Sequence, residues 1–178
     1  REYNSRRNKN LYNIQPMLMN TYIATGEGAN RYEKIPVQIY EEPATAVVTV
    51  AKEIANLIRS KAEKNEKCVL GLATGSSPIK LYEELVRMHK EEGLSFQNVI
   101  TFNLDEYLPM PKESEQSYHY FMHHHLFDHI DIDPANIHIP DGTLTSEEIE
   151  KFCKAYDQQI ESAGGIDLQV CLLYTSDA

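Results

Sequence analysis

Cysteines and basic residues are scarce in this sequence of 178 residues, and long apolar runs are missing. The three cysteines are far apart without paired spacing, so we expect neither a disulfide framework nor a zinc site: Cys68, Cys153 and Cys171. Their scarcity favours a reducing, cytoplasmic location. Seventeen Lys and Arg against 27 Asp and Glu give a formal net charge of −10, which disfavours nucleic acid and anionic membranes as partners. No apolar run approaches the length of a membrane-spanning helix.

The usual nucleotide and metal motifs are also lacking. The turn at 73–77 is not followed by the Gly-Lys-Ser/Thr of a Walker loop and has no G-x-G-x-x-G spacing, so a nucleotide ligand is disfavoured. Five histidines fall on one expected helix, but no Glu lies between them as it does in zinc proteases. We therefore expect a polar helix face or a subunit contact there and no metal: His119, His123, His124, His125 and His129.

The sequence does contain an alternation of helical stripes and short apolar runs. Apolar residues at helical spacing predict helices over 44–64, 78–92, 117–128 and 145–162. Short apolar runs predict strands over 37–40, 68–72, 98–102, 137–139 and 167–173. This alternation indicates an α/β fold with a mostly parallel, doubly wound, Rossmann-like sheet and helices on both faces. Residues 1–34, which show no clear period, are expected to form an irregular leader.

The turn from Thr74 to Pro78 is a candidate binding element, because ligands of open parallel sheets bind at the carboxyl ends of the strands. We expect Ser77 to cap the following helix and Pro78 to be its first residue. Gly75 permits a tight turn that a ligand can approach closely. Free N–H groups at the positive end of a helix suit a phosphate, and three hydroxyls add donors: Thr74, Ser76 and Ser77. A capped turn without a ligand stays open as the alternative.

The segment from Thr101 to Tyr107 ends a second apolar strand in two adjacent carboxylates, Asp105 and Glu106. Burial at a strand end raises a carboxylate pKa toward the range that is useful for proton transfer. The backbone fixes a short Asp side chain well, which suits a base that must reach one carbon of a bound sugar. A solvated acidic pair is the alternative for this segment taken alone.

Several strings, taken in order, carry a family resemblance. They are Leu-Gly-Leu-Ala-Thr-Gly-Ser-Ser-Pro at 70–78, Val-Ile-Thr-Phe-Asn-Leu-Asp-Glu-Tyr at 99–107, Ser-Tyr-His-Tyr-Phe-Met at 117–122 and Phe-Asp-His-Ile-Asp-Ile at 127–132. From about residue 35 to residue 170 the sequence closely resembles the glucosamine-6-phosphate deaminase (glucosamine-6-phosphate isomerase) family. The string Phe-Asn-x-Asp-Glu-Tyr is the most specific part of the match. The resemblance implies one sugar-phosphate isomerase/deaminase domain over 35–170.

The resemblance also implies a reaction and the residues that perform it. Enzymes of this family convert glucosamine 6-phosphate and water to fructose 6-phosphate and ammonia, with no metal or organic cofactor. Asp105 matches the family's base, which moves a proton between sugar carbons C2 and C1. The residues expected to bind the substrate are Thr74, Gly75, Ser76, Ser77, Glu106 and Tyr118. The implied partner is this small molecule, and a homo-oligomer stays open.

A second catalytic string of the family is not found in the sequence. In the family, Gly-x-Gly-x-x-Gly-His-Ile-x-Phe-Asn-Glu-Pro follows a strand that begins Gly-Ile-Asp-Leu, and its histidine opens the sugar ring. Here Gly-Ile-Asp-Leu stands at 165–168, and residues 171–178 form a tail that does not match. The resemblance therefore implies the N-terminal portion of such an enzyme, with a sheet that is incomplete on its C-terminal side. We expect these 178 residues alone to lack deaminase activity.

Three other functions stay open. A 6-phosphogluconolactonase looks related in fold and binds a similar sugar, but it hydrolyses a lactone and does not need an enolisation base at Asp105. A non-catalytic sugar-phosphate sensor would bind without turnover, and a scaffold would bind no ligand. The string Phe-Asn-x-Asp-Glu-Tyr favours the deaminase, because that chemistry requires a base at this strand end.

Overall fold

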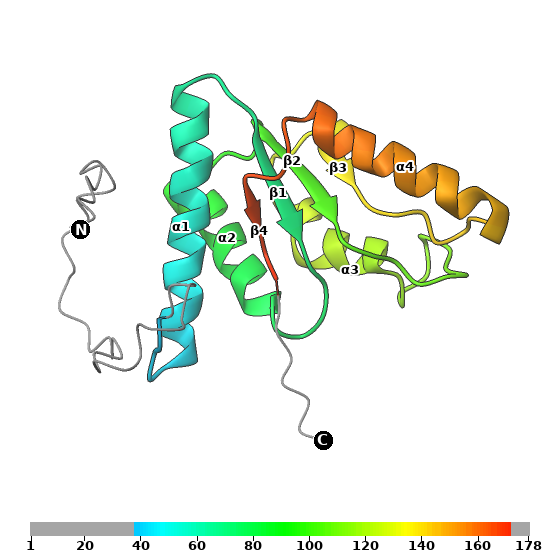
Figure 1. Cartoon of the computed structure of the whole chain (residues 1–178). Helices are drawn as coiled ribbons and strands as arrows, with labels where there is room; N and C mark the ends of the chain where they lie inside the picture. The colour runs from blue at the N-terminus through cyan, green and yellow to red at the C-terminus, as the bar shows by residue number, and fades with distance from the viewer. Residues whose placement is uncertain (1–37, 172–178) are drawn as a thin grey trace, which may run out of the picture. The chain divides into compact units, whose positions relative to one another are not determined.

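A computed structural model describes residues 38–171 (Figure 1). Its helices are α1 (Pro43–Glu63), α2 (Ile79–Glu92), α3 (Tyr118–His125) and α4 (Ser146–Ser162). Its strands are β1 (Cys68–Leu72), β2 (Val99–Asn103), β3 (Ile137–His138) and β4 (Leu168–Gln169), and two short 3₁₀ turns cover Phe127–His129 and Pro134–Asn136. The leader predicted over 1–34 and the tail after residue 171 lie outside the described residues.

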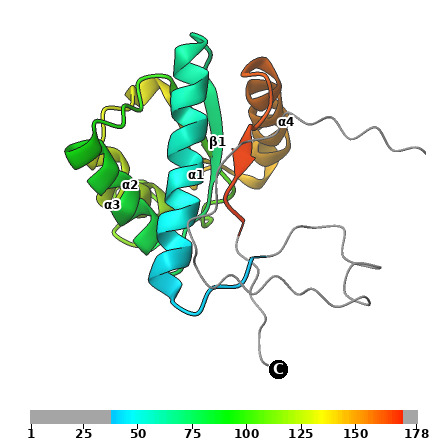
Figure 2. The same ribbon diagram turned by 90° about the vertical axis from the view of Figure 1, so that its left-hand side faces the viewer.

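The four strands form one sheet in the order β3-β2-β1-β4, and every pair is parallel. Seen along the sheet, α2 and α3 lie on one side of β1 and α4 lies on the other (Figure 2). This confirms the α/β, parallel, doubly wound fold that the alternation of patterns predicts. The carboxyl ends of the strands, and the loops that follow them, therefore lie at the same end of the sheet.

The two faces of the sheet are covered unequally. Buried side chains of α1, α2 and α3 pack with Cys68, Leu70 and Leu72 of β1 into one core. Each such Leu or Ile contributes roughly 1.5–3 kcal/mol by leaving water. On the other face α4 has no fully buried residue. It is held to β2 and β3 by Tyr156, whose hydroxyl lies 2.9 Å from the Asn103 carbonyl and 3.0 Å from the His138 carbonyl.

Most predicted elements are found, but one is wrong and several ends differ. Residues 38–40 are in neither helix nor strand, because no neighbouring strand in the described part supplies hydrogen bonds and Ile39 is 57% exposed. The helix predicted over 117–128 leaves the α conformation at Leu126 and continues as a 3₁₀ turn. The strand predicted from residue 167 begins at Leu168 and ends at Gln169.

The start of α2 is one residue later than predicted. Pro78 is the N-cap, since its carbonyl accepts from the Tyr82 N–H at 3.0 Å, and Ser77 makes no capping hydrogen bond. At the other end Gly93, with φ of +67°, stops the helix. Thr145 and Glu148 form a capping box at the start of α4.

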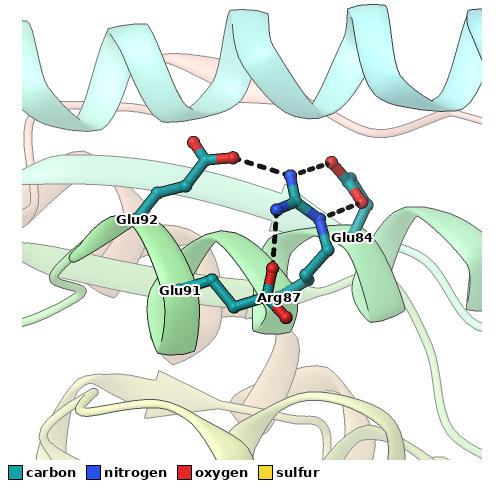
Figure 3. Close-up of polar contacts among 4 residues, drawn as sticks. All are labelled: Glu84, Arg87, Glu91 and Glu92. Carbon is teal, nitrogen blue, oxygen red and sulfur yellow. Dashed lines mark hydrogen bonds and ion pairs between the residues drawn. The ribbon is translucent and has the colours of Figure 1, made fainter.

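A charged cluster lies along α2. The Arg87 guanidinium donates to Glu84 at 2.7 and 2.9 Å, to Glu91 at 3.0 Å and to Glu92 at 2.7 Å (Figure 3). The hydrogen bond from Arg87 lowers the pKa of Glu84. These partners stand three to five residues away, the spacing at which helix side chains meet. The cluster supports the helix that follows the candidate phosphate turn.

Candidate active site

The two candidate loops leave neighbouring strands at one edge of the sheet. Leu72, the last residue of β1, pairs with Asn103, the last residue of β2, and both strands run in the same direction (Figure 1). Paired strands lie about 4.8 Å apart. The turn after Leu72 and the acidic segment after Asn103 therefore begin side by side, as the parallel topology predicts.

The turn after β1 has the backbone that a phosphate site needs. Gly75 adopts a φ of +111°, a conformation that a residue with a Cβ rarely adopts. Thr74 and Gly75 are half-buried, Ser76 and Ser77 are exposed, and Pro78 is buried. The N–H groups of Gly75, Ser76 and Ser77 have no acceptor within residues 38–171. Their donors, near the first turn of α2, are thus available to an anion.

Tyr118, at the start of α3, connects the two loops. Its ring lies 4.7 Å from the Tyr107 ring between centroids, and the side chains of Tyr107 and Thr74 are near its hydroxyl. The neighbouring Tyr107 hydroxyl, then burial, and more weakly the nearby Asp105 carboxylate raise the pKa of Tyr118 to about 12. The structure therefore brings three of the predicted residues together: Thr74, Asp105 and Tyr118.

The surroundings of Asp105 favour its protonated form. Its residue surface is exposed, yet one side of the carboxylate is shielded from water. This partial burial, and then the negative charge of Glu106, raise the pKa of Asp105 above its usual value of 3.8. The carboxylate also borders a cavity of about 340 Å³, whose walls include Leu104, Leu108 and Phe152.

Glu106 is also predicted to bind substrate, but its carboxylate accepts hydrogen bonds from backbone N–H groups of the protein. One carboxylate oxygen accepts from the N–H groups of Tyr107 and Tyr118, both at 2.9 Å, and the other accepts from the His119 N–H at 3.0 Å. The carboxylate thus faces the first turn of α3. Tyr107 is the site residue that the sequence prediction missed, although it is the last residue of the string Phe-Asn-x-Asp-Glu-Tyr.

These observations can be set beside known proteins. Residues 41–173 match the family described as glucosamine-6-phosphate isomerases/6-phosphogluconolactonase. The chain belongs to this family.

Named members of the isomerase/lactonase family are similar in sequence and in structure. A glucosamine-6-phosphate deaminase from Thermoanaerobacter sp. strain X514 is 46% identical over 121 residues, which are 68% of this chain and 47% of the relative. A solved monomeric glucosamine-6-phosphate deaminase matches with a TM-score of 0.67 and 37% identity over 73% of this chain and 52% of that one. A 6-phosphogluconolactonase from Thermotoga maritima matches with a TM-score of 0.56 and 28% identity over 69% of this chain and 53% of that one. This chain spans about half the length of each of the three.

The family resemblance and the Rossmann-like fold predicted from the sequence are thereby confirmed. The deaminases are closer to this chain than the lactonase, both in identity and in TM-score.

Several histidine side chains of α3 contact one another or an acid beyond the end of the helix. Rings of His119 and His123 stack with centroids 4.5 Å apart, and the His123 Nδ1 lies 2.8 Å from an Asp128 carboxylate oxygen. No group of three or more His, Cys, Asp or Glu residues between 38 and 171 is arranged to hold a metal ion. In the same range, no helix has both the length and the apolar character needed to cross a bilayer.

Proposed function

We propose that this protein converts glucosamine 6-phosphate and water to fructose 6-phosphate and ammonia. One observation carries the proposal: the turn after β1 and the acidic segment after β2 leave paired parallel strands side by side, and Tyr118 lies near both. A candidate anion site and the Asp105 carboxylate thus share one end of the sheet. The similarity to deaminases in sequence and structure supports the same reaction.

The turn at 74–77 binds the phosphate of the sugar. The N–H groups of Gly75, Ser76 and Ser77, which have no acceptor within residues 38–171, supply donors to the phosphate oxygens. The exposed hydroxyls of Ser76 and Ser77 add further donors without requiring a positive side chain. A protein with a formal charge of −10 can bind an anion in this way, because the partial positive charge is local.

Asp105 is the base of the isomerisation. In the open-chain sugar it takes the proton from C2 and returns it to C1, which changes the aldose into a ketose-type skeleton. The resulting imine at C2 takes up water and releases ammonia, leaving the ketone of fructose 6-phosphate. This is a hydrolytic deamination, since one water is consumed for each amine lost. A raised pKa makes the carboxylate a stronger base, which suits abstraction of a proton from carbon.

The family contains a second activity, lactone hydrolysis, that also binds a phosphorylated sugar. Hydrolysis of a lactone needs activated water and no base that shuttles a proton between two carbons. The two activities therefore differ in what they require of Asp105. A sensor that binds without turnover would require neither activated water nor a base at position 105.

The test is a coupled assay for fructose 6-phosphate with the protein expressed from its complete gene. We expect wild type to form fructose 6-phosphate and Asp105→Asn to lose about 10²–10⁴-fold in kcat while still binding the sugar phosphate. Asp128→Asn, an exposed acid beyond the end of α3, is the matched control and should keep the wild-type rate. Turnover of 6-phosphogluconolactone by wild type, unaffected by Asp105→Asn, would favour the lactonase and contradict the proposal.

A further inference from the structure

The carboxylate of Glu106 caps the N-terminus of α3 from a distant point in the chain. A helix begins with N–H groups that have no partner within the helix. The N–H groups of Tyr118 and His119 donate to the two oxygens of Glu106, at 2.9 and 3.0 Å. The next N–H, that of Tyr120, donates to the Ser117 hydroxyl at 2.9 Å. The whole first turn of α3 is thus paired, two of its three donors by Glu106.

The cap also joins two parts of the candidate site. Glu106 follows Asp105 directly, and it accepts a third hydrogen bond from the N–H of Tyr107 at 2.9 Å. The chain then runs through 107–117 before it returns at Tyr118. The Glu106 carboxylate closes this loop where the Tyr118 ring meets Thr74 and Tyr107.

We propose that Glu106 is a positioning residue, whose carboxylate fastens the first turn of α3 to the segment after β2 and thereby sets the places of Asp105 and Tyr118. It does not bind the substrate itself, since both of its oxygens face backbone N–H groups. This inference rests on the proposed function, because it assigns the roles of residues within that site. Charge matters as well as shape, because the positive end of a helix favours a carboxylate over an amide.

The negative charge of Glu106 also acts on the pKa of Asp105. After partial burial, it is the second influence that raises the pKa of Asp105. Other titratable groups near the two carboxylates come from several elements: Lys112, Glu113, Tyr118, His119, Asp141 and Asp157. None of these is altered by a substitution at position 106, so a change in the titration of Asp105 can be assigned to the Glu106 charge or to the position it sets.

Four variants of the protein expressed from its complete gene separate positioning from binding. Glu106→Gln keeps the size and removes the charge, whereas Glu106→Asp keeps the charge and shortens the reach. Glu115→Gln is the matched control, because Glu115 is an exposed acid of the same loop with no hydrogen bond to residues 38–171. Ser117→Ala loosens the same helix end without touching the charge.

We expect Glu106→Gln to lower kcat about 10–100-fold with a change in KM below about threefold. The acidic limb of the kcat/KM profile should move to lower pH, because a neutral neighbour makes Asp105 easier to ionise. Glu106→Asp should lower kcat and keep the limb in place, Ser117→Ala should lower the melting temperature alone, and Glu115→Gln should match wild type. A tenfold or greater rise in KM with unchanged kcat would make Glu106 a substrate ligand and overturn the inference.

A second readout keeps this test separate from the reaction itself. The titration of the Asp105 carboxyl carbon, followed by ¹³C NMR, should move to lower pH in Glu106→Gln and stay in place in Glu115→Gln. This result needs no turnover, so it holds or fails whether or not wild type forms fructose 6-phosphate. An unchanged Asp105 titration in Glu106→Gln would contradict the inference even in an active enzyme.

Discussion

Asp105 combines two influences that act in the same direction on one carboxyl group. Partial burial makes the ionised form less favourable, and the adjacent Glu106 repels the same charge. Both effects raise the proton affinity, as a base for carbon acids requires. The same effects act on stability, because a group that holds its proton more tightly in the folded state than in the unfolded state opposes folding once it is ionised.

This linkage gives a prediction for stability. Since the folded pKa of Asp105 is raised above 3.8, its destabilising effect is absent below that value and develops as the pH rises through the folded pKa. Asp105→Asn should therefore raise the melting temperature at pH 7.5 by about 1–3 °C, and the gain should shrink toward zero near pH 4. Scanning calorimetry at the two pH values measures it. Equal melting temperatures of wild type and variant at pH 7.5 would show that the ionised Asp105 carboxylate does not destabilise the folded protein.

At the scale of single elements, the hydroxyl of Tyr156 joins α4 to the sheet. Tyr156 contacts the Asn103 and His138 carbonyls with its hydroxyl, and its ring meets the Phe102 ring edge-on at 5.5 Å. Burial raises the pKa of Tyr156 above its ordinary value, so the hydroxyl keeps its proton for these carbonyls. The helix has no fully buried side chain, and Tyr156 itself is half-buried. Tyr156 therefore ties α4 to the strand whose end carries Asp105.

Removal of that hydroxyl has a measurable consequence. Tyr156→Phe keeps the ring against Phe102 and leaves the two carbonyls without their donor, so the free energy of unfolding should fall by about 1 kcal/mol. Urea unfolding followed by circular dichroism measures the difference. Tyr120→Phe is the control, because the Tyr120 side chain is 40% exposed and its hydroxyl has no hydrogen bond within residues 38–171. A loss of the same size in both variants would refute the assigned role of Tyr156.

The elements differ in how far the sequence could predict them. β1 and β2 follow from continuous apolar runs, and both are found almost as predicted because buried parallel strands have no polar face. The first residue of α2 could not be predicted, since Ser77 is a good cap by type but the chain turns so that Pro78 occupies that position. The strand expected at 37–40 is not formed over 38–40, the part that the structure describes, because a strand needs a partner as well as a pattern.

At the scale of the whole molecule, one part of the candidate site could be predicted from the sequence and another could not. That the 74–78 turn and the segment with Asp105 begin side by side is predictable, because parallel strands place their following loops at one edge. The contacts of Tyr118 with Thr74 and Tyr107 are not, because they depend on the path of residues 107–117 through space. The hydrogen bonds of Glu106 could not be predicted for the same reason. Its carboxylate oxygens accept from N–H groups at the start of α3, which begins at Tyr118.

The whole account requires one sugar phosphate to reach both loops at once. The most direct measurement is an NMR titration of the Asp105→Asn protein, which should bind glucosamine 6-phosphate without consuming it. We predict that the amide signals of Gly75, Ser76 and Ser77 and that of position 105 shift together with one dissociation constant, whereas inorganic phosphate shifts the turn alone. Signals that move in only one of the two loops, or with two different dissociation constants, would contradict the account.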